Sequence, residues 1–177
     1  YVERGEMMGQ KSCLLIIDMQ KGMFRWKLPV YQAEKLIENL TAAVRWAKEN
    51  RVPVIYMQHD NNTLLPLGSE NWEIADAVAP GEGDRVLRKQ RPNAFEDTEL
   101  HDTLQKEGIS ALIVGGLISN GCVQATCEGG VELGYRVILL EDGHSTVYKN
   151  PEKVIEGVHK ALAEKGVEGV SLEEWIN

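Results

Sequence analysis

Short apolar runs alternate with amphipathic stretches along the whole chain. Unbroken apolar runs that are rich in β-branched residues are typical of strands covered on both faces, as in a parallel sheet. A more polar run at 85–89 predicts an edge strand, and 167–170 predicts a weaker final strand. The apolar runs occupy residues 13–17, 52–57, 111–114 and 137–140.

The stretches between these runs follow the spacing of an amphipathic helix. Leu36, Leu40 and Val44 recur on one helix face, which predicts a helix after the first strand. A second pattern covers 154–162, and Asn150 with a following proline predicts its start. Further helices are expected to open at 97–99 and to follow 121.

This alternation of strands and helices predicts an α/β fold. Because crossovers between parallel strands are right-handed, few topologies remain. The leading one is a doubly wound, six-stranded parallel sheet of order 3-2-1-4-5-6 with helices on both faces. Ligands bind such sheets beyond the carboxyl ends of the strands, at the point where the strand order reverses. With this order, that point lies between the first and fourth strands.

The composition fits one globular domain. The chain has 177 residues, of which 43% are hydrophobic and 26% charged, close to the average for globular domains. We expect an N-terminal extension at 1–10 and a single domain at 11–177. The net charge of −8 without a basic tract argues against binding to nucleic acid or to a membrane. Three cysteines and no recognisable signal peptide favour a cytoplasmic location.

Three reactive side chains follow three of the predicted strands. Asp18 ends the first strand, Lys89 ends the third, and Cys122 follows the fourth through a glycine-rich turn. Taken alone, each has an ordinary interpretation: a loop carboxylate, a solvated lysine and a buried small thiol. The predicted strand order nevertheless brings all three to one edge of the sheet. A thiol with a carboxylate base and backbone N–H donors is suited to covalent acyl transfer.

Several surrounding features extend this candidate site. Cys122 falls near the start of a helix, where free N–H groups and the helix dipole are expected to lower its pKa. We expect Phe24, His59 and Trp72 to wall a substrate pocket. The four histidines lack tight metal-ligand spacing, so no metal and no cofactor is expected.

Five ordered blocks make the chain resemble the isochorismatase-like cysteine hydrolases. These blocks are residues 14–20, 80–89, 93–100, 108–116 and 122–126. The resemblance implies an Asp18–Lys89–Cys122 triad and a cis peptide bond between Leu117 and Ile118. It also implies an oxyanion hole formed by the backbone N–H groups of Ile118 and Cys122, and assembly into a homo-oligomer.

Departures from the family pattern narrow the expected reaction. The segment at 57–61 lacks the Asp-x-His of metal-binding nicotinamidases, whereas Cys122, which vinyl ether hydrolases tend to lack, is present. The sequence therefore predicts a cysteine hydrolase that cleaves an amide or ureido C–N bond of a small molecule through a thioester. Two alternatives remain. One is a vinyl ether hydrolase in which Asp18 protonates the vinyl carbon, and the other is a non-catalytic binding protein with the same fold.

Overall fold

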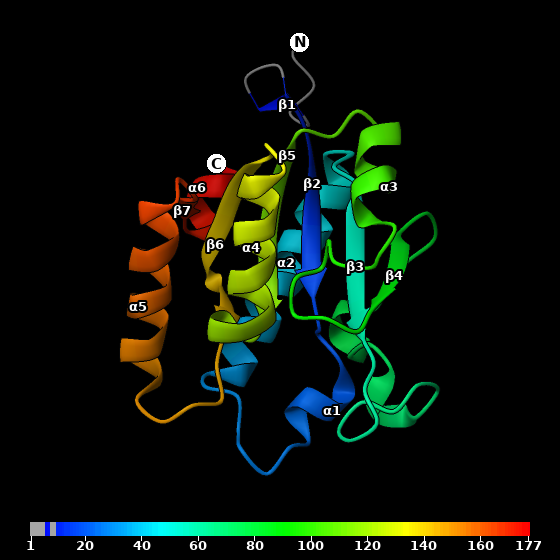
Figure 1. The fold of residues 1–177 in the computed structure, drawn as a ribbon, viewed down its shortest axis with the longest axis vertical. Helices are drawn as coiled ribbons and strands as arrows, with labels where there is room; N and C mark the ends of the chain where they lie inside the picture. The colour runs from blue at the N-terminus through cyan, green and yellow to red at the C-terminus, as the bar shows by residue number, and fades with distance from the viewer. Residues whose placement is uncertain (1–5, 8–9) are drawn as a thin grey trace.

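The protein is built around one twisted sheet of six parallel strands (Figure 1). The structure, a computed structural model, describes residues 6–7 and 10–177. The parallel strands follow the order β4-β3-β2-β5-β6-β7, and a short β1 pairs antiparallel with β2. This confirms the predicted fold class. The strands are β1 (Glu6–Met7), β2 (Gln10–Ile17), β3 (Val54–His59), β4 (Arg85–Lys89), β5 (Ala111–Leu117), β6 (Arg136–Ser145) and β7 (Glu168–Val170).

Helices cover both faces of the sheet. In Figure 1, α3, α4 and α5 lie in front of it, whereas α2 and α6 lie behind it. The helices are α1 (Lys21–Phe24), α2 (Ala33–Glu49), α3 (Leu100–Lys106), α4 (Gln124–Glu132), α5 (Pro151–Glu164) and α6 (Leu172–Ile176). Three short helical turns, η1 (Glu70–Trp72), η2 (Asp76–Val78) and η3 (Ser119–Val123), complete the connections. The expected extension at 1–10 lies largely outside the described residues.

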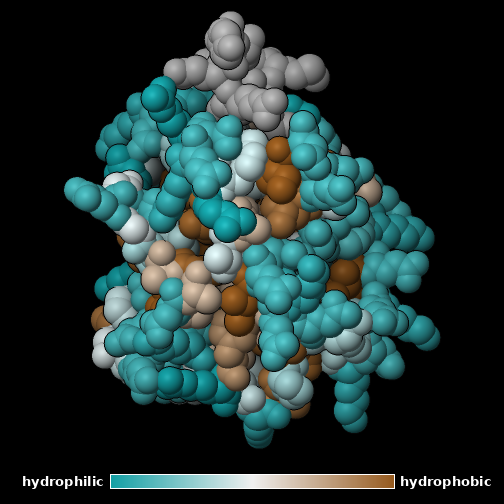
Figure 2. Space-filling model, turned by 180° about the vertical axis from the view of Figure 1, so that it is seen from behind, coloured by the Kyte–Doolittle hydropathy of each residue, from teal (hydrophilic) through white to brown (hydrophobic). Residues whose placement is uncertain are grey.

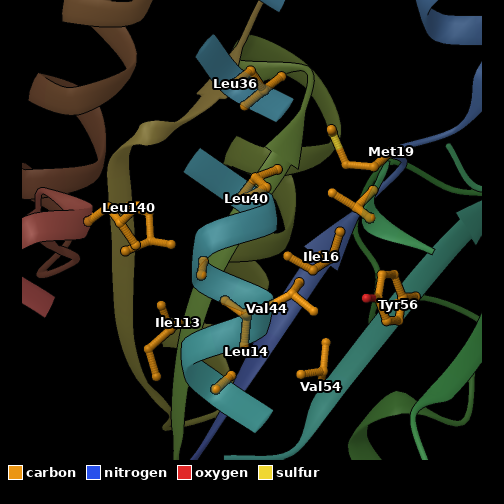
Figure 3. Close-up of a cluster of buried hydrophobic side chains, with 14 of the residues drawn as sticks. Leu14, Ile16, Met19, Leu36, Leu40, Val44, Val54, Tyr56, Ile113 and Leu140 are labelled. Atoms are coloured by element: carbon orange, nitrogen blue, oxygen red, sulfur yellow. The ribbon is translucent and has the colours of Figure 1, made fainter. Parts of the chain in front are cut away.

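The side chains of β2 divide between two hydrophobic clusters. Leu14 and Ile16 pack beneath α2, as Figure 3 shows, whereas Leu15 and Ile17 pack on the opposite face with α3, α4 and α5. Successive side chains of a strand point to opposite faces. Both faces of this strand are covered, which explains why its sequence is an unbroken apolar run.

Two predicted helix starts differ in detail from the structure. Asn150 precedes α5 with a left-handed φ of 54° and makes no side-chain cap, so Pro151 alone marks the first turn. Asp97 also has a positive φ, 55°, which is incompatible with a right-handed helix. The helix predicted to open at 97–99 therefore begins at Leu100.

The outer surface behind the sheet is mainly hydrophilic, with hydrophobic side chains visible in small groups (Figure 2). None of the helices formed by the described residues combines the length and the apolar character needed to cross a membrane.

Gly116 fixes the close approach of β5 to β2. Its φ is +129°, and a Cβ atom there would overlap the carbonyl oxygen of Ile17. We expect Gly116→Ala to lower the free energy of unfolding by about 3 kcal/mol or more, because both the backbone conformation and the strand spacing become unfavourable. Urea denaturation measures this change. Gly157→Ala is the matched control, because a Cβ there has open space, and equal destabilisation of both variants would contradict the prediction.

Candidate active site

Asp18 and Lys89 form a buried ion pair at the carboxyl edge of the sheet. Asp18 directly follows β2, and Lys89 is the last residue of β4, one strand beyond the neighbouring β3. The Lys89 Nζ lies 3.0 Å from the Asp18 Oδ2, and their side chains are 0% and 5% exposed. The lysine side chain therefore extends across β3 to reach the carboxylate.

The Lys89 ammonium group has further partners that fix its position. Its Nζ lies 3.0 Å from His59 Nδ1 and donates to the Arg91 carbonyl at 3.1 Å. An ammonium group has three N–H donors and no acceptor. With Asp18, these contacts use all three donors, and His59 Nδ1 must be the acceptor in its pair.

Gln20 holds the backbone of His59 beside this ion pair. Gln20 is fully buried, and its Oε1 accepts the His59 N–H at 2.9 Å. Its Nε2 donates to the carbonyls of His59 and Trp72, both at 2.8 Å. The end of β3 is thus tied to the segment that follows β2, which places the His59 ring next to Lys89.

Cys122 completes the cluster from the turn that follows β5, the neighbour of β2 on the side opposite β3. Its sulfur, a carboxylate oxygen of Asp18 and a ring nitrogen of His59 all lie within 4.8 Å of one another. The Asp18 Oδ1 is buried and has no hydrogen-bond partner among the described residues. The structure therefore brings together all three residues predicted for the triad and leaves one carboxylate oxygen available to the thiol.

The resting Cys122 is a thiol, which corrects the expectation of a lowered pKa. Burial raises its pKa to about 12, and the negative charge of Asp18 adds to this shift, whereas Lys89 opposes it. The cation that was expected to favour the thiolate is already paired with Asp18. Ionisation of the sulfur therefore requires transfer of its proton to a base.

The turn that carries Cys122 begins with a cis peptide bond between Leu117 and Ile118, as the resemblance implies. The Ile118 carbonyl accepts the N–H groups of Gly121 at 3.0 Å and Val123 at 3.3 Å. These bonds fold η3 back on the end of β5 and fix the backbone between Ile118 and Cys122.

Side chains from the end of β6 anchor the same turn. Ser119 Oγ and His144 Nδ1 are hydrogen-bonded at 2.7 Å, and Thr146 Oγ1 donates to Asn120 Oδ1 at 2.9 Å. His144 Nε2 in turn lies 2.8 Å from His159 Nε2 on α5. These contacts were not predicted from the sequence. The only available signal was the position of His144 after a predicted strand.

A pocket of about 290 Å³ opens over Cys122. His59 lines it as predicted, but Phe24 and Trp72 are not among its lining residues. Phe24 packs against the hydrophobic cluster beneath α2, and the buried Trp72 indole nitrogen has no partner among the described residues. The wall is formed instead by Met23, Trp26, Asn61, Thr63, Leu64, Leu65, Pro92, Ile118 and Gly121.

Asp18, His59 and Cys122 each offer an atom that could bind a metal ion. The Lys89 ammonium, however, lies 3.0 Å from both the Asp18 carboxylate and His59 Nδ1. It therefore already supplies a positive charge to these two groups, and a metal ion would have to displace it. The absence of a metal stays a prediction.

The raised pKa predicts how Cys122 reacts as the pH changes. Because the thiolate is the nucleophile and the pKa is about 12, alkylation by iodoacetamide should accelerate about tenfold per pH unit between about pH 7 and 10. Peptide mass spectrometry of timed samples measures the rate, with the fully buried Cys13 and Cys127 as slow internal references. A plateau near neutral pH would contradict the prediction.

Known proteins resemble this chain over most of its length. The family model described as "Isochorismatase domain" matches residues 12–169. The isochorismatase family protein YddQ of Bacillus subtilis is 31% identical over 154 residues, which are 84% of this chain and 86% of that protein. A streptothricin hydrolase of Streptomyces noursei is 30% identical over 76% of this chain and 50% of its own length. A ureidoacrylate amidohydrolase of Methylobacterium radiotolerans is 34% identical over 62% of this chain and 42% of its own length.

The fold is also found in solved structures. A cysteine hydrolase from Pseudomonas syringae superposes with a TM-score of 0.88, over 93% of this chain and 90% of that one. The two sequences are 22% identical, so this likeness concerns the fold.

Proposed function

Because the chain belongs to the isochorismatase family, whose members with similar sequences include named hydrolases, we propose that it is a cysteine hydrolase of amide or ureido C–N bonds. The observation that carries this proposal is the placement of the Cys122 sulfur within 4.8 Å of a carboxylate oxygen of Asp18, whose buried Oδ1 has no hydrogen-bond partner among the described residues. A thiol that is neutral at rest needs such a base in order to attack a carbonyl group.

The first half of the reaction forms a thioester. Asp18 takes the proton of the Cys122 thiol while the sulfur attacks the carbonyl carbon of the substrate. The backbone N–H groups of Ile118 and Cys122 stabilise the resulting oxyanion, and one such donor contributes about 3–4 kcal/mol in enzymes where it has been removed. The tetrahedral intermediate then collapses. The C–N bond breaks, and the proton held by Asp18 passes to the leaving nitrogen.

The second half of the reaction hydrolyses the thioester and releases the acyl group as a carboxylic acid. Asp18, again a carboxylate, takes a proton from a water molecule whose oxygen attacks the thioester carbon. The C–S bond breaks, and the proton returns to the sulfur, which restores the thiol. Lys89 stays paired with Asp18 at 3.0 Å and compensates the negative charge of the carboxylate between the two halves.

The test is to trap the covalent intermediate. The protein is mixed with a panel of small amides and ureido compounds, quenched in acid and weighed by mass spectrometry. We expect a mass increase equal to the acyl group, located on the peptide that contains Cys122. Turnover without any adduct, retained after Cys122→Ala, would overturn the thioester route. Turnover of a vinyl ether under those conditions would favour the alternative in which Asp18 acts alone.

A further inference from the structure

Among the described residues, the pocket over Cys122 has no unpaired charged side chain that could bind a charged substrate. The Asp18 carboxylate is compensated by Lys89, and all three Lys89 donors are engaged by Asp18, His59 and the Arg91 carbonyl. No lysine or arginine is among the described residues that line the pocket. A carboxylate or phosphate in this pocket would therefore lose its hydration without gaining a cationic partner.

Two arginines close to Lys89 in the sequence face acidic side chains. Arg88 donates to Asp60 at 3.0 Å, and Arg91 lies 3.9 Å from Glu96 and 3.7 Å from Asp97. Both arginines line a separate hollow that does not include Cys122. Neither one is among the described residues that line the pocket over Cys122.

His59 contributes a neutral donor to the pocket wall. Because its Nδ1 accepts from the Lys89 ammonium, its proton resides on Nε2. Burial and the charge of Lys89 also lower the pKa of His59, which keeps the ring uncharged. The remaining wall is largely apolar, with Trp26, Leu64 and Ile118 among its members.

From these contacts we infer that the substrate is an uncharged small amide or ureide with an apolar body. This inference rests on the proposed function and adds a substrate class to it. The apolar body packs against the wall of the pocket, and His59 Nε2–H donates to an acceptor group of the substrate. Ureido acids and other anionic amides are disfavoured because the described residues that line the pocket include no lysine or arginine to pair with them.

A matched series of ligands tests this inference without requiring turnover. Hexanamide, adipic acid monoamide and 6-aminohexanamide share an amide and an alkyl chain but differ in charge at the far end. Calorimetry with Cys122→Ala, and protection of Cys122 from iodoacetamide in the unaltered protein, both report binding. We expect hexanamide to bind at least about tenfold more tightly than either charged analogue. Equal or tighter binding of a charged analogue, or no binding of hexanamide, would overturn the inference.

A second test of the charge preference introduces a positively charged side chain into the pocket wall. Thr63 is exposed and lines the pocket, so Thr63→Arg adds a positive charge to a wall whose described residues include no lysine or arginine. Its affinity for adipic acid monoamide relative to hexanamide should rise by at least about fivefold, whereas the neutral control Thr63→Gln should leave this ratio unchanged. An unchanged ratio in Thr63→Arg would contradict the inference.

Binding and reaction are separable in this design. Preferential binding of hexanamide without its hydrolysis would leave the charge preference standing and reject the proposed reaction. Hydrolysis of adipic acid monoamide as efficiently as hexanamide would instead support the proposed reaction and reject the charge preference.

Discussion

Replacing Cys122 by alanine is expected to lower kcat/KM for amide hydrolysis by about 10⁴-fold or more, because the thioester forms on its sulfur and the other two cysteines, Cys13 and Cys127, are buried in a hydrophobic cluster. The described residues place one sulfur within 4.8 Å of an Asp18 oxygen, and Asp18 alone has no nucleophile to activate except water. Initial rates on the amide panel measure the effect.

Cys13→Ala is the matched control. Cys13 is fully buried inside β2 and belongs to the hydrophobic cluster beneath α3, α4 and α5. Its replacement leaves a small cavity and should reduce the free energy of unfolding by about 1–3 kcal/mol while kcat/KM stays near that of the unaltered protein. Equal activity of the two variants would reject a nucleophilic Cys122.

Lys89→Met is expected to lower the free energy of unfolding by about 3–5 kcal/mol and to abolish hydrolysis. It leaves the Asp18 carboxylate buried without its ion-pair partner, and breaking a buried pair from one side carries a cost of this size. Without the ammonium group, the carboxylate proposed as the base loses the partner that lies 3.0 Å from it, so its charge is no longer compensated. Urea denaturation and initial rates measure the two effects.

The double variant Asp18→Asn, Lys89→Met separates stability from catalysis. It removes both charges, so most of the lost stability should return, whereas the activity should not. Recovery of activity in the double variant would show that the ion pair acts only on the fold. Equal free energies of unfolding for Lys89→Met and the double variant would show that the ion pair between Asp18 and Lys89 does not stabilise the fold.

The sheet could be predicted because each buried strand is specified by a short stretch of neighbouring residues. Strands buried on both faces need continuous apolar runs, and 13–17, 111–114 and 137–140 are of this kind. The handedness of the crossovers then limits the strand order. The helix starts were less predictable because Asp97 and Asn150 adopt left-handed backbone conformations, which the identities of these residues permit but do not require.

The sequence predicted which side chains meet at the edge of the sheet, but it did not predict the pKa of the Cys122 thiol. The neighbours of Lys89 in the sequence are polar and charged, so local sequence alone favours a solvated lysine. Only the register of β4 beside β3 places the ammonium group next to Asp18. The helix start after Cys122 suggested an acidic thiol, but burial and Asp18 raise its pKa. Burial is a property of the assembled fold.

The walls of the pocket were the least predictable part. Met23 lies in α1 and Trp26 follows it, both within the connection from β2 to α2. The segment 61–65 belongs to the long connection from β3 to β4, which covers 60–84. Phe24 was predicted to line the pocket, but it faces the hydrophobic core. A shift of one or two positions in such a connection reverses which side chain faces the ligand, and hydrophobicity alone does not reveal the choice.

The different origins of the reacting groups and of the pocket wall have an evolutionary consequence. Asp18, Lys89 and Cys122 adjoin the ends of β2, β4 and β5, whereas most of the wall belongs to connections that contribute little to the sheet. Insertions and replacements in connections are tolerated far better than changes in strands. Descendants of one ancestral catalyst could therefore exchange their ligands by remodelling these two connections while inheriting the same chemistry intact.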